Sequence, residues 1–252
     1  MAPTIDQNQI ETVAQVWRKS RYPIAFTGAG ISVPSGIPDF RSPGGLWTRY
    51  NPLQVATLQA LRSNPRRVWE FLLDAVLVFK DARPNPAHLA LADLENARRL
   101  QAVITQNIDS LHQDAGSSDV VEYHGTCRRY YCPSCRTEYP YEQALELTRA
   151  DIPWACACGG VIRPDLVLFG EGIPARAQQR CVELIQSADL VCIVGTSGEV
   201  APANLIPHQI KARGGVVVEI NLGRTSYGTL TDHRFDAPAE KVLPRLVEAI
   251  LA

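Results

Sequence analysis

The stretch VITQNID, residues 103–109, decides the fold of this chain. Its first residues are apolar and mostly β-branched, as in a strand that is buried on both faces. Its last residues are polar, and they bring an amide and a carboxylate to the end of the predicted strand. Open α/β sheets bind their ligands at the carboxyl ends of their strands, so this stretch predicts a functional site.

Similar apolar runs alternate with stretches of helical periodicity along the rest of the chain. This alternation predicts an α/β fold, with a Rossmann-like, mostly parallel sheet and helices on both of its faces. We expect one strand to begin at residue 103, within the stretch 103–109. Further strands are expected at 23–27, 120–123, 165–169, 190–194 and 216–220, and helices at 6–20, 65–80, 87–97, 175–187, 203–213 and 242–250.

Two segments interrupt the α/β pattern. Residues 33–85 begin with a loop rich in Pro and Gly and continue into an apolar helix, and residues 125–164 are rich in Cys, Arg and aromatic side chains. We predict that 1–32, 86–124 and 165–252 form the Rossmann-like domain. The insertions 33–85 and 125–164 then form a smaller domain over the carboxyl edge of the sheet, with the ligand in the cleft between them.

Composition excludes several classes of protein. With 46% apolar residues in 252, the chain should fold, and a net charge of -1 argues against nucleic-acid binding. The first eleven residues have no signal-peptide pattern, and no apolar run is long enough to span a membrane. We expect a soluble, cytoplasmic protein. Its oligomeric state is left open, with a monomer as one possibility.

Four of the seven cysteines fall in two close pairs, Cys132 with Cys135 and Cys156 with Cys158. Four thiolates suit a closed, tetrahedral, structural zinc site, and such pairs fit a reducing compartment better than a disulfide framework does. Cys127 is close enough in the sequence to be a substitute ligand. Cys181 and Cys192 lie in apolar elements and are predicted to be buried.

Two glycine-containing turns follow predicted strands, and they contain Gly28, Ala29 and Gly30, and Gly195, Thr196 and Ser197. Such turns let a phosphate approach the backbone closely. The first turn lacks the third glycine of the dinucleotide fingerprint. Taken alone, it is about equally well explained as an ordinary strand-to-helix turn and as a phosphate-binding turn. Together, the two turns favour a dinucleotide that spans both halves of the sheet.

Polar side chains near these turns are candidates for chemistry. Gln106, Asn107 and Asp109 suit ribose and carboxamide groups, although residues at a strand end are also often turn formers or helix caps. His124 follows a strand next to the cleft, and its ordinary pKa suits a general base. His88 is predicted to pack or to make a hydrogen bond at a helix start.

Asp39, Phe40 and Arg41 lie in the loop rich in Pro and Gly. They would form a surface ion pair beside a packed ring, or would fold over a bound dinucleotide. In the second case, Phe40 covers a ribose and Arg41 meets a phosphate.

A set of short motifs runs from about residue 20 to the C-terminus. It comprises GAGIS at 28–32, SGIPDFRS at 35–42, TQNIDSLH at 105–112, EYHG at 122–125, the cysteine pairs, RPDLVLFGE at 163–171, GTS at 195–197 and EIN at 219–221. In this order the motifs resemble the sirtuins, the Sir2-like family, in their bacterial type. The resemblance implies an NAD-dependent protein lysine deacylase that produces free lysine, nicotinamide and an O-acyl-ADP-ribose.

The resemblance also implies roles for individual residues. His124 is the base that deprotonates a ribose hydroxyl, Asn107 orients ribose or water, and Asp109 holds the carboxamide together with the backbone of Ile108. Further contacts to NAD are implied for Ala29, Phe40, Arg41, Gln106, Ser197 and Asn221, with Gly28, Gly30, Asp39, Gly195 and Thr196 beside them. The substrate peptide would pair as an added strand with Phe169, Gly170 and Glu171 on one side and with Glu199 and Val200 on the other.

Family members that prefer succinyl or malonyl groups carry a Tyr and an Arg in the small-domain helix. Leu72 and Ala75 stand at those positions here, so we predict a preference for acetyl or longer apolar acyl groups. Two alternatives are a protein mono-ADP-ribosyltransferase and a non-catalytic NAD or zinc interaction module. A nicotinamide dehydrogenase is disfavoured by the incomplete glycine fingerprint.

Overall fold

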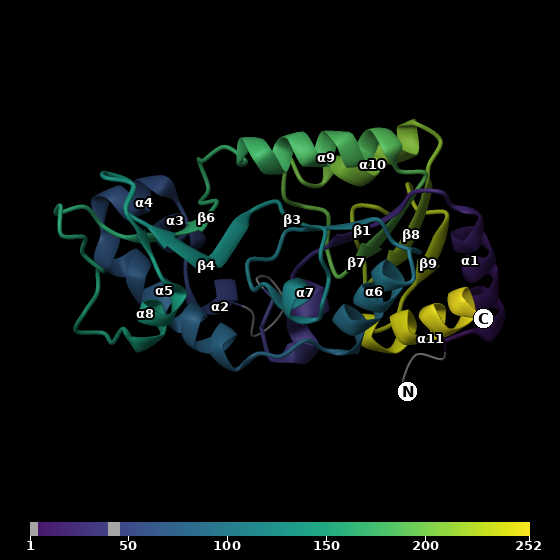
Figure 1. Ribbon diagram of the computed structural model, residues 1–252, viewed down its shortest axis with the longest axis horizontal. Helices are drawn as coiled ribbons and strands as arrows, with labels where there is room; N and C mark the ends of the chain where they lie inside the picture. Colours follow the sequence, from purple (N-terminus) through teal and green to yellow (C-terminus); the bar gives the residue numbers. More distant parts are fainter. Residues whose placement is uncertain (1–4, 40–45) are drawn as a thin grey trace.

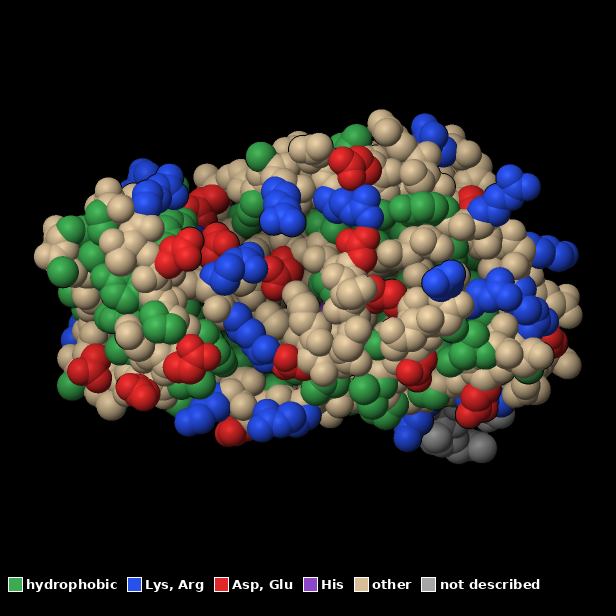
Figure 2. Space-filling view, viewed as in Figure 1, with side chains coloured by type: hydrophobic (Ala, Val, Ile, Leu, Met, Phe, Trp, Pro, Cys, Tyr) green, Lys and Arg blue, Asp and Glu red, His purple; other side chains and the backbone are tan. Residues whose placement is uncertain are grey.

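The computed structural model describes residues 5–39 and 46–252, with only the backbone for residues 46 and 47 (Figure 1). Within the described residues, no helix is both long and apolar enough to cross a membrane. On the face drawn in Figure 2, Lys and Arg side chains are interspersed with Asp and Glu.

A six-stranded sheet forms the larger part of the molecule, and all of its strand pairs are parallel. The strand order is β3-β2-β1-β7-β8-β9, so the two central strands, β1 and β7, come from distant parts of the sequence. The strands are β1 (Pro23–Thr27), β2 (Ala102–Thr105), β3 (Val120–Glu122), β7 (Leu190–Val194), β8 (Val216–Ile220) and β9 (His233–Phe235). This confirms the predicted Rossmann-like sheet and adds the short strand β9.

Helices cover both faces of this sheet (Figure 1). One face packs against α1 (Gln7–Lys19), α6 (Pro86–Asn96) and α11 (Ala239–Leu251), and the other against α9 (Ala175–Ser187) and α10 (Leu205–Ala212). The strands β1 and β7 are buried along their whole length, because both faces are covered. Cys181 and Cys192 are buried here, as predicted.

The two insertions share a second hydrophobic core, at the left of Figure 1. A three-stranded antiparallel sheet has the order β5-β4-β6, with β4 (Gly125–Tyr131), β5 (Glu138–Tyr139) and β6 (Arg163–Leu166). The helices of this part are α2 (Leu46–Arg49), α3 (Pro52–Val55), α4 (Leu58–Ser63), α5 (Pro65–Asp81) and α8 (Tyr141–Glu146).

The strand predicted at 165–169 is wrong in its bounds and in its sheet, because β6 starts at Arg163 and pairs with β4 rather than with the parallel sheet. Gly125, with φ +74°, allows this approach, since a Cβ there would lie 2.1 Å from the Asp165 carbonyl oxygen. Leu168 continues into the second core. The predicted boundary between 164 and 165 therefore falls inside β6.

Both insertions leave the larger sheet at the carboxyl ends of its strands. The first follows β1 through the short 3-10 helix η1 (Ala29–Ser35), and the second follows β3. The smaller core must therefore lie beyond the carboxyl edge of the parallel sheet, which is where the sequence places the candidate residues.

Candidate functional site

Three adjacent strands, β2, β1 and β7, end side by side, and their following turns touch one another. The Gly30 N–H donates to the Gly195 carbonyl at 2.8 Å, and the Gly28 N–H donates to the Val194 carbonyl at 3.0 Å. The Gln106 side-chain amide donates to Thr196 Oγ1 at 2.9 Å. The structure thus brings together the three segments that the sequence selected.

The glycines in these turns are required by the contact between the turns. A Cβ on Gly30 would lie 2.8 Å from the Gly195 Cα, and a Cβ on Gly28 would lie 2.6 Å from the Thr196 Cβ. Gly195 also has φ +63°, which side chains rarely adopt. The sequence suggested phosphate approach as the reason for these glycines, but the packing of one turn on the other already excludes a side chain.

Ser32, a buried residue of η1, connects two candidate residues by hydrogen bonds, although the sequence did not identify it as a candidate. Its hydroxyl donates to Asp109 Oδ2 at 2.7 Å and accepts from Asn107 Nδ2 at 3.1 Å. Asn107 Nδ2 also lies 3.2 Å from the Gly28 carbonyl. The signal available in the sequence was the position of Ser32 in GAGIS, directly after the strand.

Asp109 makes a contact at a helix start and also lies among the candidate site residues. Its Oδ1 accepts from the Leu111 N–H at 2.9 Å, a capping contact at the start of the one-turn helix α7 (Leu111–Asp114), while Oδ2 faces Ser32. Burial raises the pKa of this carboxyl, and its hydrogen bonds to Leu111 and Ser32 oppose that rise. The cap and the position in the candidate site therefore coexist.

His124 stands just beyond β3 with one ring nitrogen engaged. Its Nδ1 lies 3.1 Å from the Gln106 carbonyl oxygen, and burial lowers its pKa while this hydrogen bond opposes the shift. A carbonyl can only accept, so Nδ1 carries the proton of the neutral ring. Nε2 is left with its lone pair and with no hydrogen-bond partner among the described residues. This ring can accept a proton at neutral pH.

Two further histidines lie behind the site and were not assigned to it. His88 forms a capping box with Asn85 at the start of α6, which confirms the predicted hydrogen bond. The His112 Nε2 lies 2.9 Å from Thr27 Oγ1, and its ring centre lies 4.9 Å from that of His88. Burial lowers the pKa of both rings, to about 4 for His88. Both rings are therefore neutral at pH 7, and they pack in the core next to η1.

The end of β8 closes the site on the far side of β7. The Asn221 amide donates to the Thr196 carbonyl at 3.0 Å and lies 3.3 Å from Glu219 Oε1. Glu219 is completely buried and is held by Arg234 at 3.0 Å and by the hydroxyls of Thr225 and Thr231. Asn221 is thereby fixed against the turn that contains Thr196.

Two of the predicted residues lie outside the described part of the chain, and two others are buried in the smaller domain. Phe40 and Arg41 are outside the described residues, and Asp39 is the last residue described before that gap. Leu72 and Ala75, predicted to line an acyl pocket, are buried in α5 with 3% and 6% exposure.

The predicted peptide-binding edge is only partly open. Both backbone groups of Phe169 are used internally, because its N–H donates to the Ala56 carbonyl at 2.8 Å and its carbonyl accepts from the Leu58 N–H at 3.1 Å. The Glu171 side chain forms two hydrogen bonds with Arg163, of 2.6 and 2.8 Å. The Phe169 backbone is therefore not free to pair with an added strand.

The four paired cysteines form one cluster, with all four sulfurs within 4.8 Å of one another. The Cys132–Cys158 and Cys135–Cys156 sulfurs are 3.5 Å apart, too far for disulfides, and all seven cysteines are free. Zinc bound to four thiolates places its sulfurs about 3.8 Å apart, so this set fits zinc and leaves no open coordination position. Cys127 is buried in β4 and is not a member of the cluster.

Comparisons with known proteins agree with this site. The model of the Sir2 family matches residues 28–202. An NAD-dependent protein deacylase of Pyrococcus furiosus is 44% identical over 241 residues, which cover 94% of this chain and 96% of that protein.

Two solved structures are also close to this chain. A Sir2 homologue in complex with NAD has a TM-score of 0.90 and 36% identity, covering 99% of this chain and 95% of the other. A Sir2 variant with a deacetylated p53 peptide and 3'-O-acetyl-ADP-ribose has a TM-score of 0.89 and 36% identity, covering 95% and 97%.

Proposed function

Because the chain belongs to the Sir2 family, we propose that it is an NAD-dependent protein lysine deacylase. It takes acyl-lysine proteins and NAD as substrates and gives free lysine, nicotinamide and an O-acyl-ADP-ribose. NAD supplies both the electrophilic carbon and the leaving group, so the protein has to supply orientation, one base and exclusion of water.

The observation that carries this proposal is the position of Gln106 between the base and the nucleotide-binding turns. Its backbone carbonyl fixes the Nδ1 of His124, while its side chain contacts the turn after β7. The next residue, Asn107, reaches the turn after β1. A single segment therefore fixes the distance between a proton acceptor and the place where a dinucleotide would lie.

His124 is the general base in this proposal. Its unprotonated Nε2 accepts the proton of a ribose hydroxyl, and its lowered pKa keeps the ring neutral at pH 7. Turnover should therefore be present above this lowered pKa and fall as the pH is decreased through it. A pH profile of kcat/KM would measure this limb.

Asn107, Asp109 and Ile108 hold the reacting end of NAD in this proposal. The Asn107 amide orients ribose or water, while the Ile108 N–H and the Asp109 carboxyl hold the carboxamide. The Ile108 carbonyl already accepts from Cys127, so its N–H is the group left for a ligand. The carboxyl oxygens of Asp109 each accept one internal hydrogen bond and retain a second lone pair.

The remaining contacts to NAD are assigned to the turns and to the loop after η1. We propose that backbone groups of the glycine turns meet the phosphates, that Arg41 contributes charge and Phe40 covers a ribose, and that Ser197 and Asn221 contact the far half. The full set comprises Gly28, Ala29, Gly30, Asp39, Phe40, Arg41, Gln106, Gly195, Thr196, Ser197 and Asn221.

The substrate peptide is proposed to lie as an added strand between two backbone edges. One edge is the segment Phe169, Gly170 and Glu171, in which Gly170 pairs with the peptide, and the other is the segment Glu199–Val200. Leu72 and Ala75 provide an apolar wall for the acyl chain. Without a cationic partner, burial of a succinyl carboxylate is unfavourable. Deacetylation should therefore be faster than desuccinylation of the same peptide, and the reverse order would contradict this part of the proposal.

The smaller domain, residues 33–85 and 125–164, is proposed to hold the cofactor loop and zinc, while 1–32, 86–124 and 165–252 bind NAD. Cys132, Cys135, Cys156 and Cys158 would hold the ion structurally, apart from the reaction. Two close cysteine pairs that fit a metal site better than a disulfide framework support a reducing compartment, which we propose is the cytoplasm.

The test is to incubate the protein with NAD and an acetyl-lysine peptide and to identify the products by mass. We expect nicotinamide, acetyl-ADP-ribose and the free peptide. A His124→Ala variant should lose about 100-fold or more in kcat. The matched control is His208→Ala, since His208 is exposed on α10 and should be dispensable.

Two outcomes would replace this proposal. ADP-ribose attached to protein, with the acyl group retained on lysine, would indicate mono-ADP-ribosyl transfer. Binding of NAD without any turnover, by a protein whose His124→Ala variant behaves identically, would indicate a non-catalytic module.

A further inference from the structure

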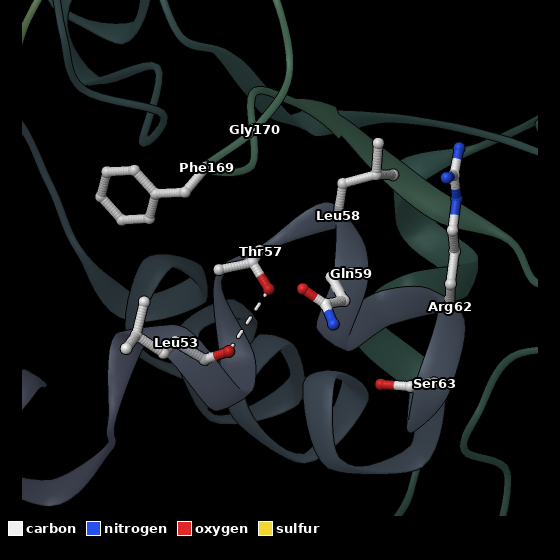
Figure 3. Close-up of a pocket in the computed structure, with 8 residues that line it drawn as sticks. All are labelled: Leu53, Thr57, Leu58, Gln59, Arg62, Ser63, Phe169 and Gly170. Carbon is white, nitrogen blue, oxygen red and sulfur yellow. Dashed lines mark hydrogen bonds between the residues drawn. The ribbon is translucent and has the colours of Figure 1, made fainter.

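A hollow opens beside the Phe169–Gly170 loop, outside the NAD-binding residues (Figure 3). It is lined by Leu53 of α3, by Thr57, Leu58 and Arg62 at α4, and by Phe169 and Gly170. In Figure 3 the Phe169 ring lies at one side of the hollow and the Arg62 side chain rises at the other. No role was assigned to α3 and α4 in the proposed reaction.

The hollow is continuous with the edge proposed to bind the peptide. Thr57 and Phe169 form a parallel bridge, and the Phe169 backbone makes hydrogen bonds to Ala56 and Leu58 on either side of it. These bonds fix the loop to the start of α4. The hollow therefore adjoins Gly170, the residue with which the substrate peptide is proposed to pair.

The lining of the hollow combines exposed apolar side chains with one Arg that has no ion pair with a described residue. Leu53 is 74% exposed and Phe169 is 49% exposed, and the two side chains line the same hollow. Arg62 is exposed and makes no ion pair with a described residue. The nearby Glu171 carboxylate is held by Arg163 at 2.6 Å; burial opposes the lowering of its pKa, to which Arg163 contributes more than Arg62 does. The charge of Arg62 is thus available to a ligand.

We propose that this hollow is a subsite for the residues that flank the acyl-lysine, and that it selects an apolar side chain together with an acidic one. The apolar side chain packs on Leu53, Leu58 and Phe169, and the carboxylate pairs with Arg62. This inference rests on the proposed deacylase function and adds a substrate preference to it. The exposed charge of Arg62 and the continuity with Gly170 both favour a peptide with an acidic side chain as the occupant.

The experiment measures kcat/KM for acetyl-lysine peptides of neutral sequence in which a Glu or a Gln is placed at each flanking position in turn. The wild-type protein should prefer Glu over Gln by about two- to fivefold at one position, the range expected for an exposed ion pair. The preference should shrink at high salt because exposed charges are screened. Arg62→Gln should bring the ratio to about one, and Arg62→Glu should invert it.

A ratio taken within each variant cancels differences in the amount of folded protein. The matched control is Lys241→Glu, which reverses an exposed cation on α11 that makes no ion pair with a described residue. This control should keep the wild-type ratio. The apolar part of the subsite is tested with peptides that carry Leu or Ala next to the acidic position. Leu53→Ser should reduce the Leu-to-Ala ratio of kcat/KM by about threefold.

The outcomes separate this inference from the function on which it rests. If no peptide is deacylated, the proposed function fails. If peptides are deacylated but the Glu-to-Gln ratio is one at every position, or if Arg62→Glu and Lys241→Glu change it equally, the subsite is refuted while the function stands. A ratio that responds only to Arg62 supports the subsite.

Discussion

Replacing Gly195 with Ala tests whether the contact between two turns holds the nucleotide-binding edge together. Gly195 follows β7 with φ +63°, and a Cβ there would lie 2.3 Å from the Ile31 backbone nitrogen and 2.7 Å from the Gly30 carbonyl carbon. Backbone atoms cannot move aside as a flexible side chain can. The turns after β1 and β7 would have to separate.

The expected loss of stability has two parts. A non-glycine residue in the left-handed region costs about 1–2 kcal/mol, and overpacking against fixed atoms costs a further ~1–3 kcal/mol. Gly195→Ala should therefore lower the free energy of unfolding by about 2–5 kcal/mol. Gly214 provides the control, since it has φ +86° but a Cβ added there would meet no atom within 4 Å. Gly214→Ala should lose only the first part.

Urea unfolding gives the free energy of unfolding of each variant. The difference between Gly195→Ala and Gly214→Ala isolates the overpacking, because the effect of Ala on the unfolded chain is the same in both. The separated turns should also raise the KM for NAD at least about tenfold in Gly195→Ala, as expected for a displaced binding site. Gly214→Ala should leave that KM unchanged. Equal destabilisation by the two substitutions, or an unchanged KM in Gly195→Ala, would refute the reasoning.

Burial lowers the pKa of His88 to about 4 from 6.5, so the unfolded chain binds the extra proton and stability falls as the pH decreases from about 6.5 towards 4. Urea unfolding should show a loss of about 2 kcal/mol between pH 7.5 and pH 5 that His88→Gln removes. Cys156→Ser should lose bound zinc, measured by atomic absorption, and should melt at a lower temperature, whereas Cys181→Ser keeps the metal. Glu219→Gln breaks its buried pair with a partly exposed arginine and should cost about 2–3 kcal/mol in urea unfolding, while raising the KM for NAD.

Much of the larger domain could be predicted because its signals are local. The buried strands at 23–27, 190–194 and 216–220 are runs of mostly apolar residues, and their bounds agree with the structure. The cysteine pairs were equally readable, since zinc ligands are recognised by residue type and spacing. The polar ends of the strands identified Gln106, Asn107 and Asp109, because parallel strands bring their carboxyl ends to one edge.

The assignment of strand 165–169 failed because an apolar run does not say which core it enters. Gly125 and its close approach to Asp165 place β6 against β4, and those residues are forty positions apart in the sequence. Ser32 was missed for a similar reason. A serine after a glycine turn is an ordinary turn residue until the fold places its hydroxyl between Asn107 and Asp109.

The sequence by itself determined most elements of the larger domain, the zinc ligands and the kinds of side chain at the strand ends, because each of these depends on neighbours within a few residues. The tertiary structure alone decided how those side chains pair. It placed the Gln106 carbonyl against His124, which fixes the tautomer and frees Nε2, and it seated Gly30 on Gly195. These contacts join segments that are far apart in the chain, so no local pattern could specify them.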